Sequence, residues 1–378
     1  MRREKQLSLR RLRRLCRKIE DPRRTWGNKL HELTDMLIIA LLAIICGCET
    51  WEEIRDYGVT KEEWLRTFLT LPHGIPCEAT FRRLMERIKP KSLEKVYRKW
   101  VTPYVGSCLR KQICVDGKTV CGVHRRSDEM LHMVSAWVRE DGISLGQVRV
   151  EGKSNEIKAI PELLEVLDIS GGTVTADAMA CQKEIAKTII ENEANYVLAV
   201  KLNQPTLYEE INEYFAWARE DPIEKKKLDV YQATSFDHGR TVHWETFVTA
   251  DIVWFEGKND WHSLRSFILV ERTRSVKGRI STELAFYISS LDTDAKHCHQ
   301  LVRGHWSVEN QLHWMLDVAF HEDACAAHTG NAPQNLSLLR KMALTCIRKD
   351  TSIKASVSRK QKIAGWDNDF ALRLLQDA

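Results

Sequence analysis

The spacing of apolar residues changes near residue 112, and this change constrains the fold more than any other feature of the 378-residue chain. Before it, apolar residues recur at three- and four-residue steps, which is typical of helices. After it, short apolar runs lie between Gly, Asp and charged residues, which is typical of strands. We expect strands at 112–116, 131–139, 144–150, 173–177 and 195–201, alternating with helices at 155–167, 182–192 and 205–220.

The order of these elements predicts one sheet topology. Three strands in a meander, followed by helix, strand, helix, strand and helix, is the order of the ribonuclease-H-like fold, an α/β fold whose mixed sheet carries helices on both faces. In that order the first and fourth strands lie side by side. Apolar runs at 230–233, 241–255, 263–273 and 282–290 then predict a β-rich insertion. A helix at 299–323 returns to the core, and 331–347 forms one more helix.

The domain organisation that follows has four parts. Residues 1–108 form an all-helical region with an Arg-rich arm, and 109–220 form the first part of the α/β domain. The insertion covers 221–290, and 291–378 complete the α/β domain and end in a basic tail at 348–362.

Positive charge gathers at the start of the chain. Residues 1–30 hold twelve Lys or Arg and three acids, a net +9, against a net +5 for the whole chain. A basic arm on a mildly acidic body suits a polyanion such as DNA, although a solvated leader segment is the alternative. A short helix, a Gly-containing turn and a basic helix at 76–90 resemble a helix-turn-helix, or else a helical hairpin. The expected DNA contacts are Arg10, Arg11, Arg13, Arg14, Arg82 and Arg83.

The eleven cysteines form no spaced ligand pairs, so a structural zinc site is not expected. Many unpaired cysteines without a signal peptide indicate the reducing cytoplasm. The longest apolar run, at 36–48, is too short to span a bilayer, and we expect no contact with a membrane.

Three acids are candidates for one metal site. Asp116 and Asp177 end the first and fourth strands, which the topology makes neighbours. Glu309 lies in the helix at 299–323, with His305 one turn before it and His313 one turn after it on the same face. Carboxylates brought together repel each other unless a cation lies between them, and oxygen ligands suit Mg²⁺ or Mn²⁺. Two such ions about 4 Å apart can clamp a phosphodiester during its cleavage.

Each acid also has a structural interpretation. Asp116 begins a good turn sequence, Asp177 could cap the next helix, and Glu309 could be a salt-bridged helix acid. Glu322 and Asp323 are rival candidates for the third ligand, just beyond the helix.

Longer motifs carry a specific resemblance across nearly the whole chain. They are WEEI at 51–54, HGIP at 73–76, VDGKT at 115–119, KSNEIKAIPELL at 153–164, TADAMACQ at 175–182, AVKLNQ at 199–204, DHGR at 237–240 and HWSVENQLHW at 305–314. In these motifs the chain resembles the ISAs1 family of insertion-sequence transposases, which includes the bacterial H-repeat-associated proteins and is similar to the IS4-like group.

The resemblance implies a DDE transposase with Asp116, Asp177 and Glu309 as catalytic metal ligands and two Mg²⁺ ions, for which Mn²⁺ substitutes. It implies binding to terminal inverted repeats, cleavage of the DNA ends and joining of the 3′-hydroxyl to target DNA by a homodimer. The alternatives are an inactive or domesticated DNA-binding relative and a stand-alone nuclease of the same fold.

Auxiliary residues are harder to assign. The IS4-like group carries Tyr, Arg and Lys at offsets that fall here on Val302, His305 and Leu316, so His305 is expected to contact phosphate, helped by Arg303 or Lys201. Lys118 either contacts phosphate or is solvated, and His238 and Arg240 contact DNA or only form a hairpin turn. We expect Trp306 and Trp314 in the core, with base stacking as the alternative.

Overall fold

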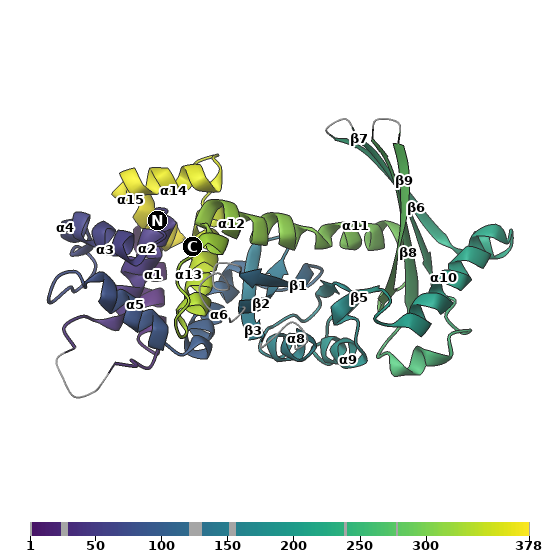
Figure 1. Cartoon of the computed structure of the whole chain (residues 1–378), viewed down its shortest axis with the longest axis horizontal. Helices are drawn as coiled ribbons and strands as arrows, with labels where there is room; N and C mark the ends of the chain where they lie inside the picture. Colours follow the sequence, from purple (N-terminus) through teal and green to yellow (C-terminus); the bar gives the residue numbers. More distant parts are fainter. Residues whose placement is uncertain are drawn as a thin grey trace.

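The computed structural model describes residues 2–23, 29–120, 131–150, 156–237, 240–276 and 279–377. A helical region lies at one end, a sheet extends from it, and part of the sheet projects away at the other end (Figure 1). Among the described residues, no helix combines the length and the apolar character that crossing a membrane requires.

The helical region is built from both ends of the chain (Figure 1). Its first part consists of α1 (Arg2–Cys16), α2 (Leu33–Ile45), α3 (Trp51–Thr60), α4 (Glu62–Leu65), α5 (Glu78–Arg87) and α6 (Pro90–Val105). Its last part consists of α13 (Ala332–Lys349), α14 (Val357–Trp366) and α15 (Asn368–Asp377). Helix α2 is buried along its whole length, which its uniformly apolar sequence explains. Leu9, Leu12 and Leu15 bury one side of α1, which packs against α15.

Within the segment 348–362, where a basic tail is expected, helix α14 occupies most of the second half. Lys360 is buried, with Nζ 3.0 Å from Oδ2 of Asp350 and donating to the carbonyl of Ile347 at 3.2 Å. These partners satisfy a charge that burial would otherwise make costly.

The described residues form one sheet of nine strands in the order β3-β2-β1-β4-β5-β9-β8-β7-β6. The strands are β1 (Gln112–Val120), β2 (Leu131–Val138), β3 (Ile143–Val150), β4 (Thr173–Ala176), β5 (Asn195–Val200), β6 (Asp229–Asp237), β7 (Arg240–Thr249), β8 (Ser266–Val276) and β9 (Arg279–Ser289). Strands β1, β4 and β5 run parallel, so β1 and β4 are neighbours as the sequence predicts.

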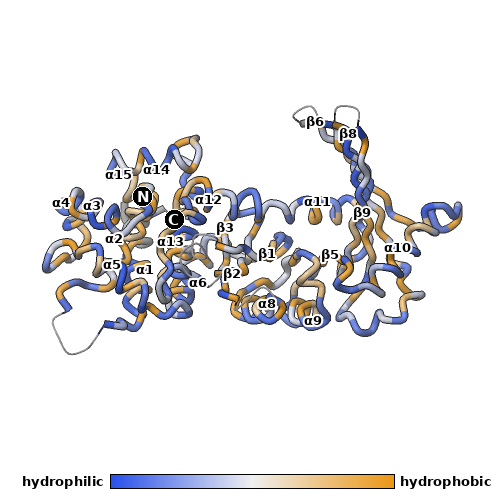
Figure 2. The backbone as a smooth tube through the Cα atoms, in the orientation of Figure 1, coloured by the Kyte–Doolittle hydropathy of each residue, from blue (hydrophilic) through white to orange (hydrophobic). Residues whose placement is uncertain are grey.

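The four strands expected between 221 and 290 are present, and they extend the same sheet. Strand β9 pairs with β5 in antiparallel fashion, with Val197 opposite Ser289. Figure 2 shows apolar residues in the lower parts of these strands, whereas hydrophilic residues predominate where the strands project beyond the rest of the molecule.

Helices cover both faces of the sheet (Figure 1). Helices α8 (Glu156–Glu165), α9 (Lys183–Glu191) and α10 (Pro205–Glu220) lie on one face. Helix α11 (Ala295–His305) lies on the other face, where Cys298 and Leu301 pack on Val197, Val248 and Ile268. Short 3-10 segments are η2 (Ala178–Ala180), η3 (Glu224–Lys227), η4 (Glu256–Asp260) and η6 (Glu322–Ala324).

The helix expected at 299–323 is interrupted. Helix α11 is followed by a π-helical segment, η5 (Val308–His313), and then by α12 (Trp314–Phe320). The expectation that Trp306 and Trp314 lie in the core is wrong, because they remain 62% and 55% exposed. Val308 and Leu312 of η5 reach the core instead, as do Leu316 and Phe320 of α12.

Candidate active site

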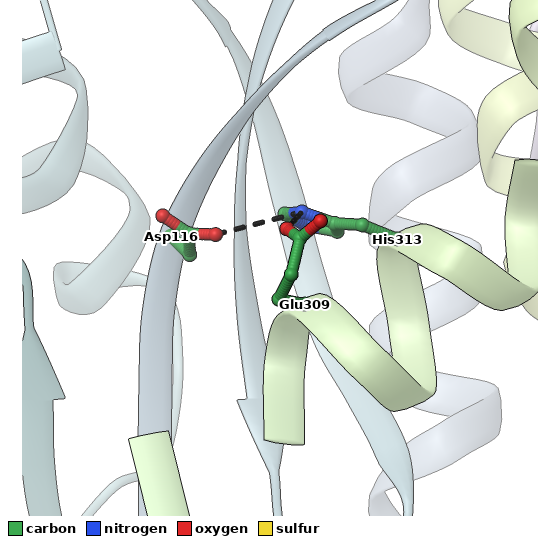
Figure 3. Close-up of side chains that lie close together, drawn as sticks. All are labelled: Asp116, Glu309 and His313. Atoms are coloured by element: carbon green, nitrogen blue, oxygen red, sulfur yellow. Dashed lines mark ion pairs between the residues drawn. The ribbon is translucent and has the colours of Figure 1, made fainter. Parts of the chain in front are cut away.

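Asp116, Glu309 and His313 meet beside strand β1 (Figure 3). Nδ1 of His313 lies 3.5 Å from Oδ2 of Asp116 and 3.3 Å from Oε2 of Glu309. One potential ligand atom from each of the three residues lies within 4.8 Å of the other two. The strand supplies one carboxylate, and the π-helical segment supplies the other and the imidazole.

Side chains of β1 fix the helical stretch over this strand. The amide of Gln112 donates to the carbonyl of Leu301 at 2.7 Å, and Sγ of Cys114 donates to the carbonyl of Gly304 at 3.6 Å. Val308 and Leu312 then anchor η5 in the core. A π-helical turn widens the helix locally, and such turns are frequent at functional sites. Glu309 and His313 consequently face Asp116.

Asp177 follows β4 and lies near this group but outside it. Its side chain is 66% exposed, and its Oδ1 is 3.7 Å from Nε2 of His305. The other ring nitrogen of His305 is 3.1 Å from Oγ1 of Thr175. The structure thus brings Asp116 and Glu309 together, and it places Asp177 beside His305.

The charges at the site are unevenly solvated. Burial raises the pKa of Asp116, the nearby Asp177 carboxylate raises it further, and the imidazoles of His313 and His305 oppose this rise. A hydrogen bond from His313 lowers the pKa of Glu309, and burial lowers the pKa of His305. A partly desolvated carboxylate beside a second one favours a cation between them.

The donor set fits a divalent cation. Carboxylate oxygens suit Mg²⁺ and Mn²⁺, whereas an imidazole is an uncommon ligand of Mg²⁺. Nε2 of His313 is buried and has no hydrogen-bond partner among the described residues, whereas Nδ1 faces both carboxylates. Sequence reasoning placed His313 on the Glu309 face and gave it no role. Its spacing of four residues from Glu309 was the available signal.

Two family models match the chain. Residues 108–346 match the model described as "Transposase DDE domain", and residues 14–101 match the one described as "DDE_Tnp_1-associated". The chain belongs to the DDE transposase family. This family implies a ribonuclease-H-like fold and a metal-dependent enzyme that cuts and joins DNA.

The transposase has relatives that align over most of their length. It is 38% identical over 347 residues to "Putative transposase YncI" of Escherichia coli O157:H7. The alignment covers 90% of this chain and 88% of the relative. It is 33% identical over 366 residues to "H repeat-associated putative transposase YhhI" of Escherichia coli strain K12. That alignment covers 94% of this chain and 95% of the relative.

The alternative that Lys118 of the transposase is solvated is wrong, and its predicted phosphate contact stays a prediction. Its side chain is 10% exposed, and its Nζ contacts Asp317, lies 3.1 Å from Glu322 and lies 3.8 Å from Asp323. Glu322, an alternative candidate for the third metal ligand, is 1% exposed. The ammonium group of Lys118 already balances the charge of its carboxylate.

The arginines predicted to contact DNA differ in their surroundings. Arg10 and Arg14 of α1 are exposed. Arg11 donates to the carbonyl of Lys99, and Arg13 donates to the carbonyl of Phe68 at 2.6 Å. Arg13 also lies 3.7 Å from the buried Asp35, so this residue stabilises the helical region.

The remaining predicted contacts lie at several places. On α5, Arg83 is exposed, and Arg82 forms an exposed pair with Glu86 at 3.3 Å. Lys201 after β5 and Arg240 at the start of β7 are exposed. Arg303 stacks on Trp244, with its guanidinium carbon 4.1 Å from the ring centroid. His238 lies outside the described residues.

Proposed function

We propose that this transposase hydrolyses a phosphodiester at each end of an insertion sequence and uses the freed 3′-hydroxyl to attack target DNA. The observation that carries the proposal is the group formed by Asp116, Glu309 and His313, whose potential ligand atoms lie within 4.8 Å of one another. Asp177 follows β4, the strand that pairs with β1, and completes an acidic edge of the sheet.

In this proposal Asp116, Asp177 and Glu309 hold two Mg²⁺ ions, with Mn²⁺ as a substitute. Bound divalent ions would neutralise phosphate charge and lower the pKa of the attacking hydroxyl. His313 holds the carboxylates of Asp116 and Glu309 in place through its Nδ1 hydrogen. His305, which Thr175 orients, contacts a phosphate oxygen of the substrate.

We also propose the ISAs1 group, the DNA site and the oligomeric state of this transposase. The quoted motifs and the relative named as H repeat-associated support membership of the ISAs1 group. Exposed Arg10, Arg14 and Arg83 support binding of terminal inverted repeats by the helical region. We propose a homodimer on DNA, because two ends must be held in one complex for joining.

A cleavage and strand-transfer assay on a labelled element end tests the reaction. Wild-type protein is expected to give cleaved and joined products with Mg²⁺ or Mn²⁺ and none with EDTA. Glu309→Gln and Asp116→Asn should lose at least about a hundredfold in rate, as removal of preorganised electrostatic groups does. Glu209→Gln, an exposed acid on α10, serves as the matched control and should keep full activity.

The outcomes separate the candidate functions. Full activity in Glu309→Gln would overturn its role as a ligand. Cleavage without joining would favour a nuclease, and tight binding of the element end without chemistry in either metal would favour a DNA-binding protein. Unfolding curves of each variant show whether an inactive variant is still folded.

A further inference from the structure

The projecting part of strands β6–β9 has two chemically different faces. The strands are in continuous register there, so residues opposite one another share a face and successive residues alternate. Trp244 is opposite Arg272, and Arg272 is opposite Glu283. The guanidinium of Arg272 donates to Glu283 at 2.5 Å, which confirms that these side chains lie on one face.

Arginines continue along this face toward the end of the strands. Arg274 follows Arg272 by two residues on β8, and Arg240 and Arg279 lie one step further, each opposite Val276. The positions from 272 to 276 span roughly 14 Å. Over that length a DNA duplex presents about eight phosphates.

The opposite face has a different composition. Thr234 and His243 are hydrogen-bonded there at 2.9 Å, and Thr273 and Thr282 at 3.2 Å. Glu271 on this face binds Arg219 of α10. Among the described residues of the projecting strands, the rows of this face contain no Lys or Arg of their own.

The face that carries Arg240, Arg274 and Arg279, here called the arginine face, is also the face on which α11 packs. His299 of α11 contacts Trp244, with ring centroids 6.2 Å apart, and Arg303 stacks on the same ring. Arg303 lies six residues before Glu309, a rise of about 9 Å along a helix. Helix α11 runs from strands β6–β9 toward α12 (Figure 1), so Arg303 lies between the arginines of these strands and the carboxylates.

We propose that Arg240, Arg274, Arg279 and Arg303 bind the phosphate backbone of duplex DNA on the side of the reacting bond that faces the projecting strands. The inference rests on the proposed function for the identity of the polyanion. Guanidinium groups spaced along two-residue steps match a regular row of phosphates, and they require no particular base sequence.

Fluorescence anisotropy with a random-sequence duplex of about 40 base pairs, in EDTA, tests this surface. The triple variant R240Q/R274Q/R279Q should bind at least about tenfold more weakly at 0.1 M salt. The slope of log affinity against log salt concentration should become less negative by about three. This corresponds to about one for each phosphate that an arginine no longer neutralises. The matched control T241Q/S275Q/T282Q changes the same strands on the opposite face and should bind as the wild type does.

Replacement of the three arginines by lysine keeps the charge and should retain most of the binding, which excludes loss of fold as the cause. Wild-type affinity and salt slope in R240Q/R274Q/R279Q would overturn the proposal, as would an equal loss in the opposite-face control. Binding is measured without metal and without a cognate end. Failure of the cleavage assay therefore leaves this test intact.

Discussion

Nζ of Lys118 lies 3.1 Å from Oε2 of Glu322, a carboxylate that is 1% exposed. The same lysine contacts Asp317 of α12. Burial alone would raise the pKa of Glu322, yet the charges of Lys118, Arg340 and Lys341 hold that pKa below its usual value. Lys118 thereby connects β1, which carries Asp116, to the helix that follows Glu309 and His313.

Lys118→Met should destabilise the fold by about 3 kcal/mol, because it leaves a buried carboxylate without its cation. Urea unfolding at neutral pH measures the loss. Adding Glu322→Gln to this variant should recover part of the stability, since the uncompensated charge is then removed. A stability unchanged by Lys118→Met would show that Glu322 is neutral in the folded protein.

His313→Phe should weaken Mn²⁺ binding on the order of tenfold, as loss of a group that orients metal ligands does. Isothermal titration calorimetry without DNA measures the affinity. His305→Phe is the comparison, because His305 lies beside Asp177 and not between Asp116 and Glu309. An equal effect of both substitutions would contradict the distinct role of His313.

Glu94 makes stability depend on pH. Burial raises the pKa of Glu94 to about 7, against the opposing effects of Gln334 and Arg98. A carboxyl whose folded pKa exceeds its unfolded pKa stabilises the fold while protonated. That stability is lost as pH rises from the unfolded value toward 7.

The free energy of unfolding should therefore fall by about 2 kcal/mol between pH 5.5 and pH 7.5 through this group. Glu94→Gln should remove that part of the dependence, because glutamine can still accept the hydrogen bond from Gln334 and does not ionise. Urea unfolding at the two pH values compares the proteins. An identical pH dependence in both would show that Glu94 keeps an ordinary pKa.

Trp306→Ala should cost less than about 1 kcal/mol of stability, because a surface side chain loses little packing. Trp100→Ala, at a fully buried position, should cost about 4 kcal/mol. Denaturant unfolding of both variants under one condition makes the comparison. Similar losses would mean that Trp306 is covered by other residues in solution.

The central part of the fold follows from local sequence pattern. Short apolar runs ending at Asp116 and near Asp177 predict neighbouring strands, and β1 and β4 do pair in parallel. The pairing of β9 with β5 could not be predicted in this way, because it joins residues about ninety positions apart and leaves no local signal.

The geometry of the site was less predictable. A helical period places His305, Glu309 and His313 on one face, but a π-helical turn changes the angle between successive residues. His313 consequently meets Asp116, whereas His305 meets Asp177. The ion pairs of Lys118 could not be predicted either, because its partners lie about two hundred residues away in the sequence.

Helix α1 packs against α15, from which more than three hundred residues of sequence separate it. Helix α1 also packs against α6 and α2, so α15 covers only part of its apolar side. The contact between α1 and α15 closes a loop of more than three hundred residues, which has a high entropic cost. A circular permutation that links the two ends would convert this distant contact into a local one and should accelerate folding.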